Sequence, residues 1–424
     1  MLAGEIGEGV RVKRAEIPVA HRRCLMLLQG NEGYGVRRAV LDLSKQLVLN
    51  SVELHFVAMR SGPFVAELKG LAYPVTVMEQ ATSEGIRRKG FGFVLGCIAV
   101  FRQSLTAKRR LVSIIEDVKP DWIHLPVASL LILAGLAGRT AKRPVYWHLH
   151  NTVVSKLPMR LQPLCYQLIC KLAKVTPMGN SQHTAASLGD ALCKPEVLYP
   201  GVDTQFFNPD RVKAPLRKSD FGFEETVPLF AIVARMNPSK AQDRVVEAAI
   251  GLLAEGKRLS LMLVGGPLDS DYSVSLQKTI DAAGAGEAIK LVDRVEDPRP
   301  YFQLADVVIN SRKDAEPFGL SLVEAMLMER PVLAYALGGP SETVGVGVTG
   351  WLVDEPTVEG YRRGIIQALK DEARWKSMGA ASRARAAERY SQEITTAHYL
   401  KLVASRDTSV RSKRSDWARG GVVA

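Results

Sequence analysis

Short apolar runs alternate with longer helical patterns along the first half of this 424-residue chain. Strands are predicted where β-branched and aliphatic residues cluster: Cys24–Leu28, Glu53–Ala58, Val75–Met78, Trp122–Leu125, Val145–Leu149 and Val197–Tyr199. Between them lie segments of helical periodicity such as Gly35–Leu49 and Lys156–Lys174. This alternation is typical of βαβ units and indicates a parallel sheet.

The same alternation begins again after Asn208 to Thr226, a polar stretch with two prolines that we interpret as an interdomain connection. The second series of predicted strands is Leu229–Ala234, Ser260–Val264, Ile289–Val292, Val307–Asn310 and Pro331–Tyr335. The helical patterns of this half are Ala241–Glu255, Ser273–Ala283, Leu320–Glu329 and Glu359–Asp371.

Two successive α/β series of similar length predict two Rossmann-like, doubly wound parallel-sheet domains that face each other across a cleft. The expected boundaries are residues 1–207 and 208–390 for the two domains, 391–405 for a terminal helix that packs back on the N-terminal domain, and 406–424 for a disordered basic tail. Ligands of such sheets bind at the carboxyl ends of the strands, so we expect the active site in the cleft.

Charge is unevenly distributed along the chain, whose formal net charge is +12. Residues 85–189 hold fifteen Lys and Arg against three acids, so the whole excess lies in this stretch. Localised positive charge favours an anionic partner. Nucleic acid is not expected as that partner, because no recognition motif accompanies the charge.

The sequence carries no pattern typical of a secretory signal or a membrane span. Residues 1–23 are charged and mixed, and the longest apolar run, Phe91 to Phe101, is about half of the ~20 residues that a spanning helix needs. We therefore expect a cytoplasmic protein. The five cysteines form no CxxC pair and have no histidine at zinc spacing, so reduced thiols and no metal site are expected.

The segment from Asp314 to Asp354 is the richest in candidate chemistry. Glu316 ends a loop, and Pro317 stands where a helix is expected to begin, so free N–H groups of the first turn would attract a phosphate. The loop carboxylate of Glu316 could accept hydrogen bonds from sugar hydroxyls, and Glu324, about two turns further on, could reach a ribose. Gly338 and Gly339 would allow backbone to approach a ligand.

Two cations and a histidine follow the ends of other predicted strands. Arg235 and Lys240 flank the loop after Leu229–Ala234, where they could neutralise a diphosphate. His150 ends the strand Val145–Leu149, on the same face as His148, and no Asp or Glu occurs between residues 122 and 189 to orient it. Gly33 and Gly35 open the first helix and could approach a phosphate or sugar, although their spacing is not the dinucleotide fingerprint.

Taken together, these motifs resemble glycosyltransferase family 4, the glycosyl transferases group 1 of retaining GT-B enzymes. The paired glutamates, the Arg235 and Lys240 pair, Gly265-Gly266 and the step Tyr199-Pro200-Gly201-Val202-Asp203 each match the family pattern. Two positions depart from it: Asp293 stands near the place of a common glycine, and Asn151 replaces a commoner Asp.

The resemblance implies a GT-B fold and a metal-independent, retaining hexosyltransferase that uses a UDP- or GDP-linked sugar. Glu316 is similar to the residue that binds donor hydroxyls, and His150 to one beside the reacting carbon. The implied donor-binding set is Arg235, Lys240, Glu324, Gly265, Phe318, Gly319 and Leu320. A nucleotide-sugar epimerase and a non-catalytic nucleotide-sugar-binding protein remain alternatives, because a fold does not determine its function.

In this architecture the N-terminal domain binds the acceptor, which we expect to be a glycan or a lipid-linked molecule. Residues 85–175 combine basic residues with leucines at helical spacing, from Leu157 to Leu172. These leucines either face the domain core or lie on an anionic membrane surface, on the cytoplasmic face of the membrane.

Overall fold

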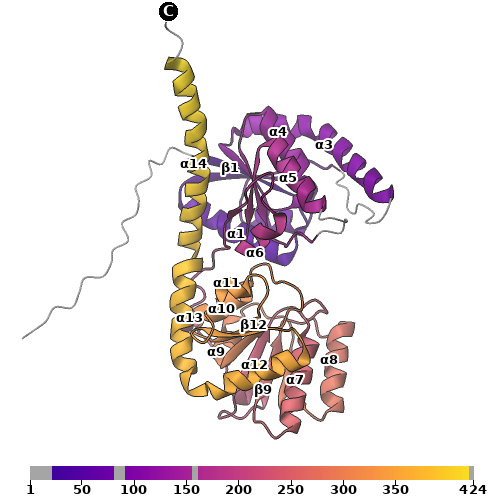
Figure 1. Ribbon diagram of the computed structural model, residues 1–424, viewed down its shortest axis with the longest axis vertical. Helices are drawn as coiled ribbons and strands as arrows, with labels where there is room; N and C mark the ends of the chain where they lie inside the picture. Colours follow the sequence, from indigo (N-terminus) through magenta and orange to yellow (C-terminus); the bar gives the residue numbers. More distant parts are fainter. Residues whose placement is uncertain (1–21, 81–90, 155–160, 420–424) are drawn as a thin grey trace, which may run out of the picture.

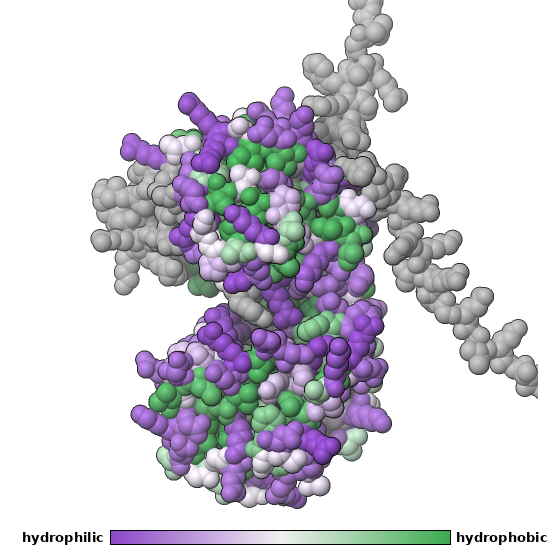
Figure 2. All heavy atoms as spheres, turned by 180° about the vertical axis from the view of Figure 1, so that it is seen from behind, coloured by the Kyte–Doolittle hydropathy of each residue, from purple (hydrophilic) through white to green (hydrophobic). Residues whose placement is uncertain are grey.

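The computed structural model describes residues 22–80, 91–154 and 161–419, and its two α/β domains lie one above the other in Figure 1. Side chains are described within these ranges except at residues 34, 91–101, 103 and 406–419. Seen from behind, the molecule has two lobes that join on one side and are separated by a notch on the other (Figure 2).

The N-terminal domain contains a seven-stranded parallel sheet with the order β3-β2-β1-β4-β5-β6-β7. Its strands are β1 (Arg22–Leu28), β2 (Val52–Ala58), β3 (Val75–Val77), β4 (Trp122–Leu125), β5 (Val145–Leu149), β6 (Val175–Gly179) and β7 (Glu196–Val197). The helices between them are α1 (Tyr34–Leu49), α2 (Pro63–Gly70), α3 (Phe91–Val118), α4 (Leu131–Thr140), α5 (Leu161–Ala173) and α6 (Gln182–Leu188).

The C-terminal domain repeats this plan with a six-stranded parallel sheet of order β10-β9-β8-β11-β12-β13. Its strands are β8 (Leu229–Val233), β9 (Ser260–Val264), β10 (Ile289–Val292), β11 (Val307–Asn310), β12 (Val332–Tyr335) and β13 (Gly350–Val353). Its helices are α7 (Gln242–Ala254), α8 (Asp271–Ala282), α9 (Arg299–Leu304), α10 (Leu320–Leu327), α11 (Pro340–Thr343), α12 (Val358–Lys370) and α13 (Trp375–Tyr390), and the long α14 (Gln392–Arg419) follows.

The predicted fold class, two doubly wound parallel sheets, is confirmed. The sequence pattern did not reveal β6 and β13. In β6 the run Val-Thr-Pro-Met-Gly contains a polar residue and a proline, which normally argues against a central strand. All five residues are nevertheless buried, and Pro177 lies opposite Trp147 of β5 in the ladder. In β13 the strand begins with Gly350, whose Cβ would lie 1.9 Å from the carbonyl oxygen of Val332.

Alternate side chains of each central strand enter different hydrophobic cores. In β1, Leu25 and Leu27 pack with α3, α4 and α5, while Cys24, Met26 and Leu28 pack with α1, α2 and α14. Both faces of the sheet are therefore covered by helices, which explains why its central strands are mostly apolar.

The chain crosses between the domains at two adjacent points. Val202 on the first crossing donates its N–H to the carbonyl oxygen of Tyr390 at 2.8 Å, and Gln392 on the second donates to Val202 at 3.2 Å. Val202 and Phe207 already pack in the core of the C-terminal domain. The two crossings thus form a short joint that can act as a hinge.

Helix α14 runs along the side of the N-terminal domain in Figure 1 and is attached by the buried Tyr399. The Tyr399 hydroxyl accepts a hydrogen bond from Trp122 Nε1 at 2.8 Å and lies 2.9 Å from His124 Nδ1. Residues 406–419, which the sequence predicts to be disordered, continue this helix to Arg419. They contain neither glycine nor proline, so nothing in this stretch of sequence ends the helix.

We predict that Tyr399→Phe lowers the free energy of unfolding by about 1–3 kcal/mol, because the buried Trp122 N–H and the His124 ring nitrogen lose their hydrogen-bond partner. The measurement is thermal and urea denaturation, monitored by circular dichroism. Tyr301→Phe in the C-terminal domain is the matched control and should unfold like the parent protein. An unchanged stability in Tyr399→Phe would show that this contact does not hold α14.

Candidate functional site

Glu316 lies in the loop between β11 and α10 and is almost fully buried. Lys240 Nζ binds its Oε2 atom at 2.9 Å, and Arg312 Nη1 lies 3.6 Å from its Oε1 atom. The side chain of Asn310 also donates to this carboxylate. The structure thus brings Glu316 into direct contact with Lys240, 76 residues away in the sequence.

The pKa of Glu316 reflects a competition between burial and positive charge. Burial alone would raise the pKa of this carboxyl, but Lys240 and Arg312, together with hydrogen bonds from Lys240 and Asn310, hold it below its ordinary value. The group is therefore a carboxylate at neutral pH. A carboxylate can accept hydrogen bonds from hydroxyl groups, but it has no proton to donate.

The backbone of this loop is clamped against the Gly338-Gly339 turn. Gly339 donates its N–H to the Glu316 carbonyl at 2.7 Å, and a Cβ on Gly338 would lie 2.3 Å from the same oxygen. Gly338 also has a φ of +86°. The two glycines therefore allow backbone to approach backbone, where the sequence pattern had predicted an approach to a ligand.

Helix α10 begins at Leu320, where the helical pattern Leu320–Glu329 begins, and not at Pro317. Gly319 caps it with a φ of +94°, a left-handed conformation that interrupts any helix from Pro317 onward. The prediction that Pro317 occupies the first helical turn is therefore wrong. The helix start next to the Glu316 loop is formed by Gly319 and Leu320.

Arg235 and Lys240 belong to the loop between β8 and α7, at the carboxyl end of β8. Arg235 is exposed, and no ion pair of its guanidinium occurs among the residues that the structure describes. Lys240 is held by the neighbouring loop between β11 and α10, since Ser311 Oγ of that loop donates to the Lys240 carbonyl oxygen at 2.7 Å. Gly265, also predicted to bind the donor, has a φ of +134°, and its Cβ would lie 2.5 Å from the Ala234 oxygen. Gly265 therefore lets the end of β9 pack against the loop that carries Arg235 and Lys240.

Glu324 lies on the second turn of α10 and forms an ion pair across the domain interface. Its Oε1 atom lies 2.9 Å from Nη1 of Arg38, on α1 of the N-terminal domain. Burial raises the pKa of the Glu324 carboxyl, against the opposing effect of Arg38. Arg38 was not singled out by sequence reasoning, because only the tertiary structure brings α1 to α10.

Phe318 cannot offer its ring to a donor in this structure. Its side chain is 2% exposed and packs in the core, with its ring centroid 5.3 Å from that of Tyr390 and 6.0 Å from that of Tyr199. The motif needs this aromatic residue to anchor the loop, so only backbone atoms of Phe318 remain available to a ligand.

His150 follows β5 and lies beside His148, with 4.2 Å between the ring centroids. Burial lowers the pKa of His150 well below its ordinary value, and His148 and His124 reinforce the effect. The ring is therefore neutral, and its Nε2 atom is buried with no hydrogen-bond partner among the described residues. The structure places it in a histidine cluster instead of against Glu316 or Lys240.

Gly33, at the end of the loop between β1 and α1, and Gly35, in the first turn of α1, border open space, since an added Cβ at either would meet nothing within 4 Å. The close backbone approach is at Gly30, whose Cβ would lie 2.1 Å from the Arg60 oxygen. Glu32 accepts hydrogen bonds from the N–H groups of Gln29 and Gly30 and fixes the loop. Gly33 and Gly35 thus remain free to face a ligand.

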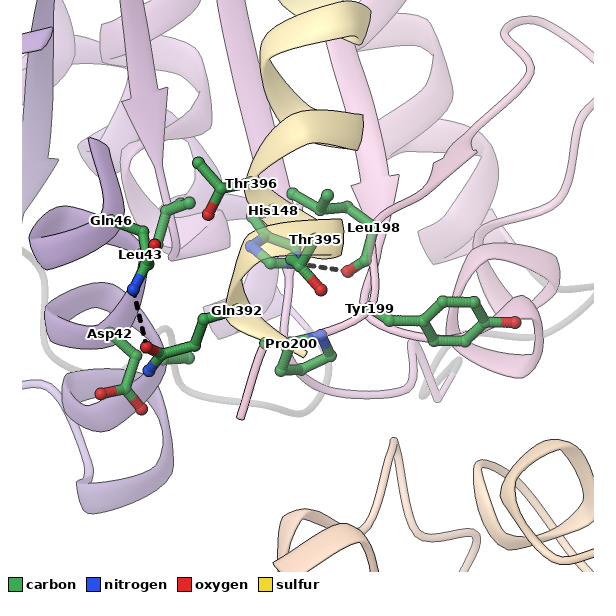
Figure 3. A pocket seen from close by; sticks show the side chains of 12 residues that line it. Asp42, Leu43, Gln46, His148, Leu198, Tyr199, Pro200, Gln392, Thr395 and Thr396 are labelled. Carbon is green, nitrogen blue, oxygen red and sulfur yellow. Dashed lines mark hydrogen bonds between the residues drawn. The ribbon is translucent and has the colours of Figure 1, made fainter. Parts of the chain in front are cut away.

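A small pocket lies at the joint between α1, α14 and the end of β7 (Figure 3). His148 and Leu198 line it and are joined by a 3.0 Å hydrogen bond, and Gln46 donates to Gln392 at 2.9 Å. Its volume of about 20 Å³ is enough for about one water molecule. This pocket is not the donor site.

Metal-binding clusters and membrane-spanning helices are both absent from residues 22–80, 91–154 and 161–419. No group of three or more His, Cys, Asp or Glu side chains in these ranges is arranged to bind a metal ion. None of the helices in the same ranges combines the length and the apolar character needed to cross a membrane.

Comparisons with known proteins agree with this architecture. The profile of Glycosyltransferase Family 4 matches residues 34–206, and that of Glycosyl transferases group 1 matches residues 215–385. A GDP-mannose-dependent alpha-(1-6)-phosphatidylinositol monomannoside mannosyltransferase of Mycobacterium tuberculosis is 30% identical over 76% of this chain and 87% of that protein. A D-inositol 3-phosphate glycosyltransferase of Catenulispora acidiphila is 34% identical over 46% of this chain and 48% of that protein.

Solved structures share the fold at lower identity. The Anabaena protein HepE in complex with UDP superposes with a TM-score of 0.72 at 20% identity, over 90% of this chain and 100% of that chain. A glycosyltransferase from Rickettsia africae gives a TM-score of 0.77 at 17% identity, over 91% and 99%. The chain therefore belongs to the family 4 glycosyltransferases, with a C-terminal domain of the glycosyl transferases group 1, and is an enzyme with the GT-B fold.

Proposed function

We propose that this glycosyltransferase moves a hexose from a nucleoside diphosphate hexose to a lipid-linked or glycan acceptor, with retention of anomeric configuration and without a metal ion. The observation that supports the proposal most directly is the pairing of the buried Glu316 carboxylate with Lys240, whose loop also carries the exposed Arg235. This arrangement offers an acceptor for sugar hydroxyls and cations for a diphosphate within two neighbouring loops.

The donor is proposed to be GDP-linked or UDP-linked, with GDP-mannose as the first candidate. A relative that is 30% identical is named as GDP-mannose-dependent, and HepE was solved with UDP. The mycobacterial and Catenulispora relatives are both named as transferases, which does not favour an epimerase or a non-catalytic binding protein.

In the proposed reaction, the bond between the anomeric carbon and the phosphate oxygen breaks while the acceptor oxygen bonds to the same face of that carbon. The acceptor's proton passes to the departing phosphate, so no protein carboxylate acts as nucleophile. Arg235 and Lys240 stabilise the charge that develops on the diphosphate. Glu316 positions the hexose by accepting hydrogen bonds from the sugar hydroxyls. Glu324 binds the ribose after its ion pair with Arg38 has opened. Neutral His150 is proposed to lie beside the sugar after the cleft closes.

The acceptor domain carries an exposed row of leucines that fits a membrane surface. Leu161, Leu164, Leu168 and Leu172 of α5 are 37%, 42%, 47% and 60% exposed, so these four do not face the core. They recur at helical spacing, and the exposed Lys171 and Lys174 lie beside them. We propose that this face binds anionic lipid. The basic residues at 85–90 and 156–160 lie outside the described residues.

A panel of nucleoside diphosphate sugars tests the proposed function. We expect GDP, UDP or a sugar conjugate of one of them to raise the melting temperature, because a ligand stabilises the folded state that it binds. The best responder should be consumed with a lipid-linked acceptor, in the presence of EDTA, and give a product of unchanged anomeric configuration by NMR. No stabilisation and no sugar release with any donor would contradict the proposal.

Arg235→Ala should weaken nucleoside diphosphate binding by about tenfold or more, the worth of a lost charge-assisted hydrogen bond. Arg235→Ala tests diphosphate binding more specifically than Lys240→Ala, because the latter would also leave the buried Glu316 without its main counter-charge. Calorimetry with the free diphosphate measures the effect. Arg258→Ala, which removes an exposed guanidinium of the same domain, is the control. Equal affinity in Arg235→Ala and the parent protein would place the diphosphate elsewhere.

Glu316→Gln should lower kcat by about 100-fold with little change in diphosphate affinity, because Glu316 is proposed to position the sugar and not the phosphates. Steady-state kinetics with the donor from the panel measures this. Glu329→Gln, an exposed carboxylate at the end of α10, serves as control. Parent-level turnover in Glu316→Gln would remove the residue from the site.

Vesicle flotation tests the leucine face. The parent protein should float with phosphatidylglycerol-containing vesicles at low salt and much less with phosphatidylcholine alone, since the attraction is partly electrostatic. The double variant Leu168→Ser, Leu172→Ser should lose this binding, whereas Leu268→Ser on the other domain should retain it. Equal recovery with both kinds of vesicle would overturn this part of the proposal.

A further inference from the structure

One carboxylate of the C-terminal domain binds three donors of the N-terminal domain. Glu342 Oε1 accepts a hydrogen bond from the His183 N–H at 2.8 Å. Its Oε2 atom accepts one from the Gln182 N–H at 2.9 Å and one from the Tyr199 hydroxyl at 3.0 Å. Neither the fold prediction nor the proposed transfer step assigns a role to this residue.

The donors are well suited to a carboxylate. Gln182 and His183 are the first two residues of α6. Backbone N–H groups at this position have no partner within the helix and lie at the positive end of the helix dipole. Ser181 caps the next N–H, that of Thr184, so α6 begins with all three of these groups satisfied. Burial and the nearby Glu342 raise the pKa of Tyr199 to about 12, so its hydroxyl keeps the proton that it donates.

Glu342 is held firmly from its own domain. Its carbonyl oxygen accepts a hydrogen bond from Arg385 Nη2 at 3.0 Å, and Arg385 Nε donates to the Thr343 carbonyl at 2.8 Å. The residue lies on α11, which follows the Gly338-Gly339 turn that is bonded to the Glu316 backbone. The contact with α6 is therefore rigidly connected to the loop that carries Glu316.

A second contact lies beside the first. Thr184 Oγ1 donates to the carbonyl oxygen of Pro317 at 3.3 Å, directly after Glu316. The start of α6 thus contacts both segments that surround the proposed sugar site. Since Tyr199 lies just before the hinge at Val202, the Glu342 contacts join the hinge, the acceptor domain and the donor loop.

We propose that Glu342 is a positioning residue that holds the two domains together beside the hinge and so sets the acceptor site against the Glu316 loop. This inference rests on the proposed function. Sugar transfer needs both domains, whereas nucleoside diphosphate binding needs only the C-terminal domain. A substitution of Glu342 should therefore slow transfer and leave diphosphate binding unchanged. A misplacement of about 1 Å between reacting groups can cost about 100-fold in rate.

The test compares Glu342→Ala, Glu342→Gln and Tyr199→Phe with the exposed control Glu372→Gln. Glu342→Ala should lower kcat at least about tenfold, with diphosphate affinity within about twofold of the parent protein. Tyr199→Phe, which removes one of three hydrogen bonds, should lower kcat by about fivefold. Small-angle scattering of Glu342→Ala with bound diphosphate should show a larger radius of gyration than the parent complex.

The outcomes separate this inference from the proposed function. If the parent protein binds no nucleoside diphosphate, the proposed function fails. If the parent binds and transfers, and Glu342→Ala matches it in kcat and in radius of gyration, the positioning role is wrong. Equal losses of diphosphate affinity and of kcat would also overturn it, because they would indicate general damage to the C-terminal domain. A kcat loss in Glu342→Gln that is smaller than in Glu342→Ala would support it.

Discussion

The proposed site depends on the pairing of the buried Glu316 carboxylate with the Lys240 ammonium group. A carboxylate this deeply buried is costly unless opposite charge and hydrogen bonds compensate it. Lys240, Arg312 and Asn310 supply both, and they hold the group in its ionised form. The pair therefore fixes the β8–α7 loop against the β11–α10 loop, and it keeps a negative and a positive group ready beside each other for hydroxyls and phosphates.

The same two loops are shaped by glycines whose task is backbone packing. Gly265, Gly338 and Gly319 all have positive φ, and the first two lie where a Cβ would collide with a neighbouring carbonyl oxygen. Phe318 contributes a buried ring instead of a ligand contact. Much of the motif around Glu316 thus serves to hold a charged side chain in place, which is what a preorganised site requires.

Communication between the domains runs through a few charged contacts. Arg38 reaches Glu324, and Glu342 reaches the start of α6, while the two chain crossings are bonded to each other at Val202. These contacts are small in number beside the hydrophobic cores within each domain, so the domains can move relative to each other without disturbing either core. In the proposed reaction, the ribose of a nucleotide sugar would compete with Arg38 for Glu324, and this would couple donor binding to the position of the N-terminal domain.

The sequence by itself determined the two α/β series, because periodic apolar residues report local structure. It also proposed Glu316, Glu324, Arg235 and Lys240 as site residues, through their motifs and a family resemblance. It did not reveal β6, in which Thr176 and Pro177 interrupt the apolar run, or the helix over residues 406–419. The tertiary structure alone decided that Phe318 faces the core, that His150 lies in a histidine cluster, and that Arg38 and Glu342 join the domains. These features depend on which residues of distant segments meet, and such contacts leave no periodic or local signal in a single chain.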